Sequence, residues 1–217
     1  MAEIRDTFAL QPVRSRVERF HGLRWTVRSD TVVLQDDQEV LRDIVVHTGA
    51  VGIVAINERD EILLNRQYRH PVGGYLWEPP AGLLDIADED PLVCAQREFV
   101  EEAGLVAGSW SVLVDFFNSP GGSSEAFRCF LARDIREAPG GRPPAEGEET
   151  TLEPVWLPLD EALTKVLAGE LMNPTAVTGI LAASAAKQRG WADLRPADSP
   201  WPAREHLLRE GLVRLDP

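Results

Sequence analysis

The run Val51-Gly52-Ile53-Val54-Ala55-Ile56 constrains the fold more than any other feature of this chain. A strand without a polar face has to lie inside a sheet that is covered on both sides. Strand-like and helix-like segments follow it without strict alternation: strands at 61–68, 110–117, 126–131 and 153–156, and helices at 91–103, 160–169 and 174–190. This order predicts an α/β (α+β) fold with a mixed sheet and helices on both faces.

The first 46 residues have a different pattern. Apolar and β-branched residues alternate with charged ones at 23–33 and 39–46, and the polar run 35–38 separates them. This pattern predicts short antiparallel strands joined by a turn. We therefore expect a small N-terminal antiparallel β element over residues 1–46, and a main domain with C-terminal helices and a tail over residues 47–217.

The chain is acidic, with 35 Asp and Glu against 22 Lys and Arg and a formal net charge of −13. Such a surface repels nucleic-acid phosphates and anionic lipid headgroups, so we expect neither nucleic acid nor membrane as a partner. A substrate that carries phosphate needs local cations or bound metal to overcome the same field. The two cysteines, and the lack of a signal peptide or membrane-spanning run, indicate a cytoplasmic protein.

The segment 91–103 has the clearest helix boundaries in the chain. Asp90 suits the N-cap, Pro91 suits the first helical position, and Gly104 suits the left-handed residue that ends a helix. The side chains of this segment can therefore be assigned to helix faces.

Glu98, Glu101 and Glu102 share one face of this helix, because they are spaced at i, i+3 and i+4. Their charges repel one another and lie near the C-terminal end, where the helix dipole disfavours anions. Arg97 relieves part of this repulsion through an i,i+4 pair with Glu101. A divalent cation would complete the cluster, and oxygen ligands suit Mg²⁺ or Mn²⁺. The alternative is an ordinary solvated acidic face, which the three glutamates alone would favour.

The spacing around these glutamates resembles the Nudix box. Gly82, Glu89 and the block Arg97–Leu105 match its order, with seven residues between Glu89 and Arg97. There is one departure, because six residues rather than five separate Gly82 from Glu89, in the loop before the helix. The resemblance implies the Nudix α/β/α sandwich with a mixed sheet. It also implies a magnesium-dependent hydrolase that splits a nucleoside diphosphate linked to another group.

The same resemblance implies roles for residues of the box. The metal ligands would be Glu98, Glu101, Glu102 and the backbone carbonyl of Ala81. Arg97 and Glu89 look like the family's orienting pair, which holds the helix against the loop, and Arg97, Glu98 and Glu102 would serve catalysis. The alternative for the orienting pair is a plain surface ion pair, worth about 0–1 kcal/mol.

Segments outside the box look like one branch of this family, the ADP-ribose pyrophosphatases. Pro120 lies sixteen residues after the glycine that ends the box helix, a spacing similar to the mark of that branch. The segments 67–69 (Gln-Tyr-Arg), 77–82 (Trp-Glu-Pro-Pro-Ala-Gly) and 41–46 (Leu-Arg-Asp-Ile-Val-Val) also resemble it. Over residues 16–190 the chain looks most similar to actinobacterial members, which share the six-residue spacing. The implied reaction is ADP-ribose plus water giving AMP and ribose 5-phosphate.

By this resemblance the protein is a homodimer whose N-terminal strands reach the partner. The adenine would lie between an aromatic ring of one chain and an arginine of the other, at the positions of Trp25 and Arg42. An indole face and a guanidinium plane can sandwich a purine, and the alternative for Trp25 is a ring in the sheet core. Arg69 looks like the phosphate-binding arginine, and Glu125 like a glutamate that contacts the substrate. Their alternatives are a solvated strand-end arginine and an edge-strand glutamate.

Similar enzymes take their general base from a glutamate on a loop near the end of the domain. Here the Pro- and Gly-rich loop at 138–150 offers Glu146, Glu148 and Glu149. Alignment back from Trp156 favours Glu149, with Glu148 next. The alternative is an acidic loop without a catalytic role.

Three competing hypotheses stay open at this point. A Nudix pyrophosphatase for another nucleoside diphosphate sugar, such as GDP-mannose or an ADP-sugar, would carry the same box. A Nudix-fold sensor would bind ADP-ribose without cleaving it. Such proteins often lack some of the residues of the box, whereas the box of this chain is intact. A purely structural acidic protein would leave the box spacing unexplained.

Overall fold

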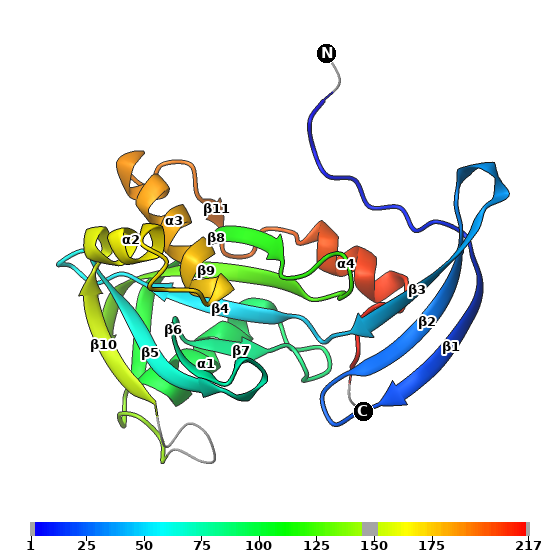
Figure 1. Cartoon of the computed structure of the whole chain (residues 1–217). Helices are drawn as coiled ribbons and strands as arrows, with labels where there is room; N and C mark the ends of the chain where they lie inside the picture. The colour runs from blue at the N-terminus through cyan, green and yellow to red at the C-terminus, as the bar shows by residue number, and fades with distance from the viewer. Residues whose placement is uncertain (1–2, 145–151, 216–217) are drawn as a thin grey trace.

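The predicted central strand is β4 (Ala50–Ala55), and all of its residues are buried. The computed structural model describes residues 3–144 and 152–215, and it places β4 in a five-stranded sheet of order β11-β8-β9-β4-β7 (Figure 1). The other strands are β7 (Ala81–Leu83), β8 (Leu105–Phe117), β9 (Ala126–Glu137) and β11 (Arg195–Pro196). Only the β4–β9 pair is parallel, so the sheet is mixed as predicted.

Helices cover both faces of this sheet, which confirms the α/β/α sandwich. Successive residues of β4 point to opposite sides, as in any strand. Ile53 lies in the core beneath α1 (Pro91–Ala103). Val54 lies in the core beneath α2 (Leu159–Leu167) and α3 (Pro174–Gln188).

A second, antiparallel sheet has the order β10-β5-β6. Its strands are β5 (Glu61–Arg69), β6 (Gly74–Glu78) and β10 (Glu153–Pro158). We predicted neither β6 nor β7, because each is short and they flank Pro79 and Pro80. Proline has no amide hydrogen for a ladder, so the chain leaves the second sheet here and enters the first. The start of the box therefore lies where the two sheets meet.

The N-terminal residues form a separate antiparallel sheet beside the main body (Figure 1). Its strands are β1 (Val13–His21), β2 (Thr26–Val33) and β3 (Glu39–Val46). The predicted pair is present as β2 and β3, and the turn between them holds Asp36 and Asp37 at φ of 72° and 56°. Strand β1 was not predicted, because it has no continuous apolar face and nearly the whole strand is exposed.

The C-terminal segment links this sheet to the main body. It contains the helix α4 (Pro202–Arg209). Beyond it, Arg28 of β2 donates a hydrogen bond to the Gly211 carbonyl at 3.0 Å, and Arg214 donates to the Gly22 carbonyl at 2.8 Å. Within residues 3–144 and 152–215, no helix combines the length and the apolar character needed to cross a membrane.

Candidate active site

The box helix α1 begins and ends where the sequence predicts. The Asp90 side chain accepts hydrogen bonds from the backbone amides of Leu92 (2.8 Å) and Val93 (3.4 Å). Gly104 ends the helix in the left-handed conformation, at φ 67°. These caps satisfy amide and carbonyl groups that a helix end leaves without partners. They also set the length of the helix, and with it the residues that share each face.

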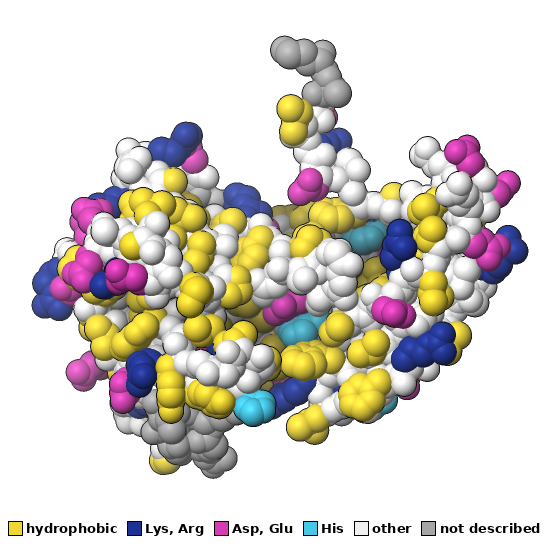
Figure 2. All heavy atoms as spheres, viewed as in Figure 1, with side chains coloured by type: hydrophobic (Ala, Val, Ile, Leu, Met, Phe, Trp, Pro, Cys, Tyr) yellow, Lys and Arg dark blue, Asp and Glu magenta, His cyan; other side chains and the backbone are white. Residues whose placement is uncertain are grey.

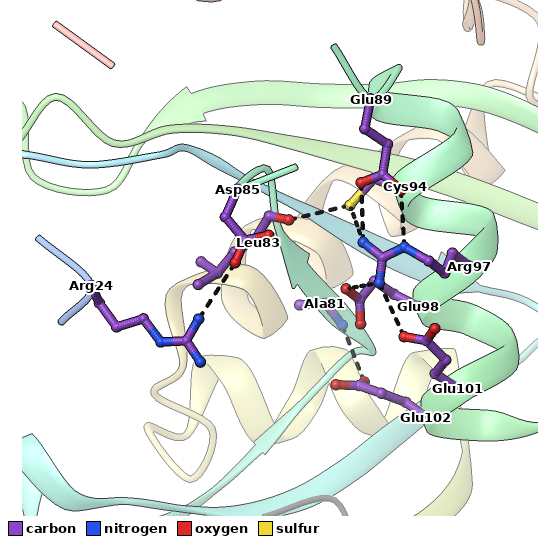
Figure 3. Close-up of polar contacts among 10 residues, drawn as sticks. All are labelled: Arg24, Ala81, Leu83, Asp85, Glu89, Cys94, Arg97, Glu98, Glu101 and Glu102. Atoms are coloured by element: carbon purple, nitrogen blue, oxygen red, sulfur yellow. Dashed lines mark hydrogen bonds and ion pairs between the residues drawn. The ribbon is translucent and has the colours of Figure 1, made fainter. Parts of the chain in front are cut away.

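The three predicted carboxylates lie on one side of α1, facing the segment that contains Ala81 (Figure 3). Arg97 joins two of them, because its Nη1 donates to Oε1 of Glu98 at 2.8 Å and to Oε2 of Glu101 at 3.0 Å. The predicted i,i+4 pair of Arg97 with Glu101 is therefore present. Among the described residues, the like charges lie together, and the Arg97 guanidinium offsets part of their repulsion.

Arg97 also binds Glu89 through two parallel hydrogen bonds, Nε to Oε1 at 2.9 Å and Nη2 to Oε2 at 3.0 Å. The Glu89 side chain is only 9% exposed, so this contact is not a plain surface ion pair. Hydrogen bonding to Arg97 lowers the pKa of Glu89, and the same bonds raise the pKa of Arg97. Both groups stay charged at neutral pH, and they hold the loop against the helix.

Gly82 lies directly against Glu98. A Cβ atom added at Gly82 would lie 2.2 Å from Cγ of Glu98 and 2.4 Å from its Oε1, closer than atoms approach. Only glycine therefore leaves room for Glu98 in its present position. The additional loop residue does not disturb this contact, so Gly82 keeps its place despite the six-residue spacing.

Glu102 is held from the opposite side. Its Oε2 accepts hydrogen bonds from the backbone amide of Ala81 at 3.2 Å and from Nδ2 of Asn65 at 3.3 Å. Asn65 is 1% exposed, and its Oδ1 has no hydrogen-bond partner among the described residues. Ala81, predicted as a metal ligand through its carbonyl, is thus next to Glu102.

The donors of this site suit a hard divalent cation, because the carboxylates of α1 and the Ala81 carbonyl all offer oxygen. Within the described parts of the chain, no three acidic, histidine or cysteine side chains already form a group that could hold a metal ion by themselves. A cation here would thus need water or substrate oxygens as further ligands, which is common for Mg²⁺. The absence of a side chain at Gly82 leaves the space that the Glu98 side chain occupies, so the backbone at Gly82 helps to position at least one of these carboxylates.

Arg69, at the end of β5, pairs with a buried carboxylate. Its Nη2 is 2.8 Å from Oε1 of Glu78, whose side chain is 6% exposed. Asn173, the N-cap of α3, donates from Nδ2 to the other oxygen of Glu78. Burial raises the pKa of Glu78, and the Arg69 guanidinium acts in the opposite direction. Arg69 is therefore a tethered cation rather than the solvated strand-end arginine of the alternative hypothesis.

Trp25 lies in the turn between β1 and β2 and is 46% exposed, so it is not a ring of the sheet core. Its indole stacks against the His47 ring, with centroids 6.1 Å apart and planes at 26°. Nε2 of the same His47 ring is 3.8 Å from Oε1 of Glu125. The structure therefore brings together Trp25 and Glu125, which are far apart in sequence, around a histidine.

Arg42 does not join this group within one chain. It is exposed on β3, opposite Asp30 of β2, whereas Thr26 beside Trp25 lies opposite Val46. Four residues of strand separate the two positions, which is roughly 13 Å. The candidate bases Glu146, Glu148 and Glu149 lie outside the described residues.

Three polar residues of the site were not predicted as site residues: Asn65, Glu78 and His47. Asn65 and Glu78 are directly opposite each other in the β5–β6 register, and both are buried polar residues next to apolar ones. Buried polar groups in strands almost always have polar partners, so each was a signal of a nearby polar site.

The comparisons with known proteins agree with this geometry. A family model described as NUDIX domain matches residues 46–174. The chain is 44% identical over 180 residues to the ADP-ribose pyrophosphatase of Mycobacterium tuberculosis, covering 83% of this chain and 86% of that protein. It is 30% identical over 135 residues to the GDP-mannose pyrophosphatase of Cronobacter sakazakii, covering 59% of this chain and 69% of that protein. The crystal structure of an ADP compounds hydrolase shares the fold, with a TM-score of 0.69 at 21% identity over 86% of this chain and 99% of that chain.

Proposed function

The chain belongs to the Nudix family of hydrolases, and from that premise we propose that it hydrolyses ADP-ribose to AMP and ribose 5-phosphate. The observation that carries the proposal is the acidic face of α1, where Glu98, Glu101 and Glu102 lie together beside Ala81. The choice of ADP-ribose is supported by the similarity to the Mycobacterium tuberculosis enzyme over most of both chains. The relatives that act on GDP-mannose make another nucleoside diphosphate sugar the second candidate.

We propose Mg²⁺, or Mn²⁺ in its place, as the cofactor, held by Glu98, Glu101, Glu102 and the Ala81 carbonyl. When bound, the ion neutralises charge that develops on the phosphoryl and leaving-group oxygens and makes water easier to deprotonate. Arg97 keeps Glu98 and Glu101 oriented, because it binds one oxygen of each. Asn65 and the Ala81 amide fix the direction of Glu102.

Other residues of the chain would bind the substrate and move the proton. We propose that Arg69, tethered by Glu78, binds a phosphate, and that the nucleoside part binds beside Glu125 and Trp25, which both lie next to His47. We propose Glu149, with Glu148 next, as the base that accepts a proton from the attacking water.

We further propose a homodimer in which Arg42 of one chain completes the adenine site around Trp25 of the other. The strand positions of these residues support this, because within one chain their backbone positions are roughly 13 Å apart along the sheet. Exposed apolar side chains on the N-terminal sheet also support it: Phe20 is 62% exposed and Leu41 is 59% exposed. Division into an N-terminal dimer-forming element and a catalytic domain follows from the same proposal. A cytoplasmic location is in line with the free thiols of Cys94 and Cys129.

Product analysis tests the proposed function directly. Purified protein incubated with ADP-ribose and Mg²⁺ should release AMP and ribose 5-phosphate, and EDTA should stop the release until excess Mg²⁺ restores it. Parallel reactions with GDP-mannose and with an ADP-sugar test the second candidate function. A kcat/KM higher for one of these substrates than for ADP-ribose would favour that function. Binding of ADP-ribose without AMP release would identify a sensor instead. Sedimentation of the same sample tests the dimer.

Glu78→Gln should raise the KM for ADP-ribose about tenfold without destabilising the protein, because Arg69 loses a charged partner. Burial raises the pKa of Glu78, so its charge opposes folding at neutral pH, and this effect disappears as the pH falls through the folded-state pKa. The variant should therefore equal or exceed the wild type in unfolding free energy at pH 7, by up to about 1 kcal/mol. Urea unfolding at pH 7 and at lower pH should show that the difference in unfolding free energy between the variant and the wild type becomes smaller as the pH falls. A variant less stable at pH 7, with unchanged KM, would contradict both expectations.

A further inference from the structure

His47 lies at the joint between the N-terminal sheet and the main domain. Residues 47–49 make the whole connection between β3 and β4. His47 is 7% exposed. Its amide donates to the Ser124 hydroxyl at 3.0 Å, and its carbonyl accepts from the Arg214 amide at 3.2 Å. The backbone at this joint is thus held by the segment before β9 and by the C-terminal tail.

The two ring nitrogens of His47 have different neighbours. The Gly49 amide donates to Nδ1 at 3.0 Å, so Nδ1 is an acceptor and the neutral ring carries its hydrogen on Nε2. That hydrogen faces Glu125, whose Oε1 is 3.8 Å from Nε2, beyond a direct hydrogen bond. Burial lowers the pKa of His47, against the effect of Glu125, so the ring is neutral at pH 7.

The indole of Trp25 covers one side of the same ring. The turn that carries Trp25 makes a further polar contact with the box loop, where Arg24 Nη1 is 3.4 Å from Oδ2 of Asp85 (Figure 3). That contact is between partly exposed groups, whereas His47 is buried. Figure 2 shows the hollow between the N-terminal sheet and the main body, with histidine and acidic side chains inside it.

We propose that His47 is a positioning residue for substrate binding. Its ring sets the position of Trp25 relative to Glu125, and so shapes the part of the site that receives the nucleoside of the substrate. This inference rests on the proposed function, which assigns both residues to the substrate. His47 itself touches no reacting atom, so its loss should change affinity rather than the rate of bond cleavage.

His47→Asn tests the proposal. Asparagine can offer an oxygen near the position of Nδ1, so the Gly49 amide keeps an acceptor, but the ring face and the Nε2 hydrogen are lost. We expect KM for ADP-ribose to rise about tenfold with kcat within about twofold of wild type. The Kd of ADP-ribose, measured by calorimetry in EDTA where turnover does not occur, should rise by a similar factor. His47→Gln, which returns an N–H near Nε2, should recover part of the affinity.

His206→Asn is the matched control. His206 is also 7% exposed and also stacks on an aromatic ring, that of Phe8, with centroids 5.7 Å apart and planes at 28°. It lies on α4, outside the proposed site, so its loss should leave KM, Kd and kcat within about twofold of wild type.

The outcomes separate this inference from the proposed function. If wild-type protein binds and cleaves ADP-ribose while His47→Asn leaves KM and Kd unchanged, or shifts them no more than His206→Asn, the inference is overturned and the proposed function stands. A loss of kcat at unchanged KM in His47→Asn would also overturn the inference and leave the proposed function standing. If wild-type protein neither binds nor cleaves ADP-ribose, the proposed function fails and the inference with it. Should His47→Asn fail to fold, His47→Gln carries the same comparison, and an unchanged KM and Kd in that variant overturns the inference.

Discussion

Glu102→Gln is expected to lower kcat for ADP-ribose hydrolysis by about 10³-fold or more while the protein stays folded. A bound divalent ion supplies several kcal/mol of charge stabilisation in phosphoryl transfer, and each 1.36 kcal/mol is tenfold in rate. Glutamine keeps an oxygen for the Ala81 amide and the Asn65 amide group, so the contacts that hold residue 102 survive. It removes the negative charge that a cation at this face needs.

The same substitution should have a distinct stability signature. Glu98, Glu101 and Glu102 crowd three negative charges at the C-terminal end of α1, so removing one should stabilise the metal-free protein by about 0.2–1 kcal/mol. Wild-type protein should gain Tm when Mg²⁺ is added, because a ligand that binds only the folded state stabilises it, and the variant should gain less. Thermal unfolding with Mg²⁺ and with EDTA measures both effects.

Glu170→Gln is the control for this experiment. Glu170 makes an exposed ion pair with Lys165 at 3.1 Å, far along the chain from the box. Its loss should leave kcat and the Mg²⁺-dependent change in Tm as in wild type. If Glu102→Gln behaves like Glu170→Gln, the acidic face of α1 does not hold the ion, and the proposed site is wrong.

The helix α1 could be predicted residue by residue because its determinants are local. Asp90, Pro91 and Gly104 act within one turn of the helix ends, and the spacing of the glutamates sets their shared face without reference to any other element. Strand β4 could be predicted equally well, because six apolar residues in a row leave a strand no polar face to expose, and all six residues of β4 are buried. These two elements determine the core architecture and the carboxylate cluster.

The contacts that position substrate-binding residues could not be predicted in the same way. Glu78, the partner of Arg69, lies opposite Asn65 because of the register between β5 and β6, and register depends on pairing between strands rather than on either strand alone. His47 reaches Trp25 and Glu125 only after three distant segments pack together. In strand β1 the alternation of charged and uncharged residues ends at Arg19, and nearly the whole strand is exposed, so no continuous apolar face marked it as a strand.

The six residues between Gly82 and Glu89 fit between two fixed contacts of the box. The loop between β7 and α1 contains Asp88 at φ 60°, a left-handed residue that lets the chain turn before the Asp90 cap. Both ends of the box therefore keep their contacts: Glu89 still reaches Arg97, and Gly82 still faces Glu98. The departure from the family pattern changes the loop and leaves the carboxylate face in place.

Gly82→Ala should lower kcat/KM for ADP-ribose by about 100-fold, because displacing a catalytic group by about 1 Å commonly has an effect of this size. The new Cβ would lie 2.2 Å from Cγ of Glu98, so the Glu98 side chain has to swing away and give up its 2.8 Å contact with Arg97. The backbone at Gly82 is not in the left-handed region, so alanine adds no backbone strain there. The unfolding free energy should therefore change by less than about 1 kcal/mol, which separates a misplaced carboxylate from an unfolded protein.

Gly121→Ala is the control that isolates the steric cause. Gly121 also has an ordinary φ, and a Cβ added there would meet nothing within 4 Å. The two variants make the same chemical change, but only Gly82→Ala presses on a carboxylate of α1. Steady-state kinetics and urea unfolding of both variants should show a loss of activity in Gly82→Ala alone, at nearly equal stability. Full activity in Gly82→Ala would mean that Glu98 works from some other position, and that the cradle at Gly82 has no part in holding a metal ligand.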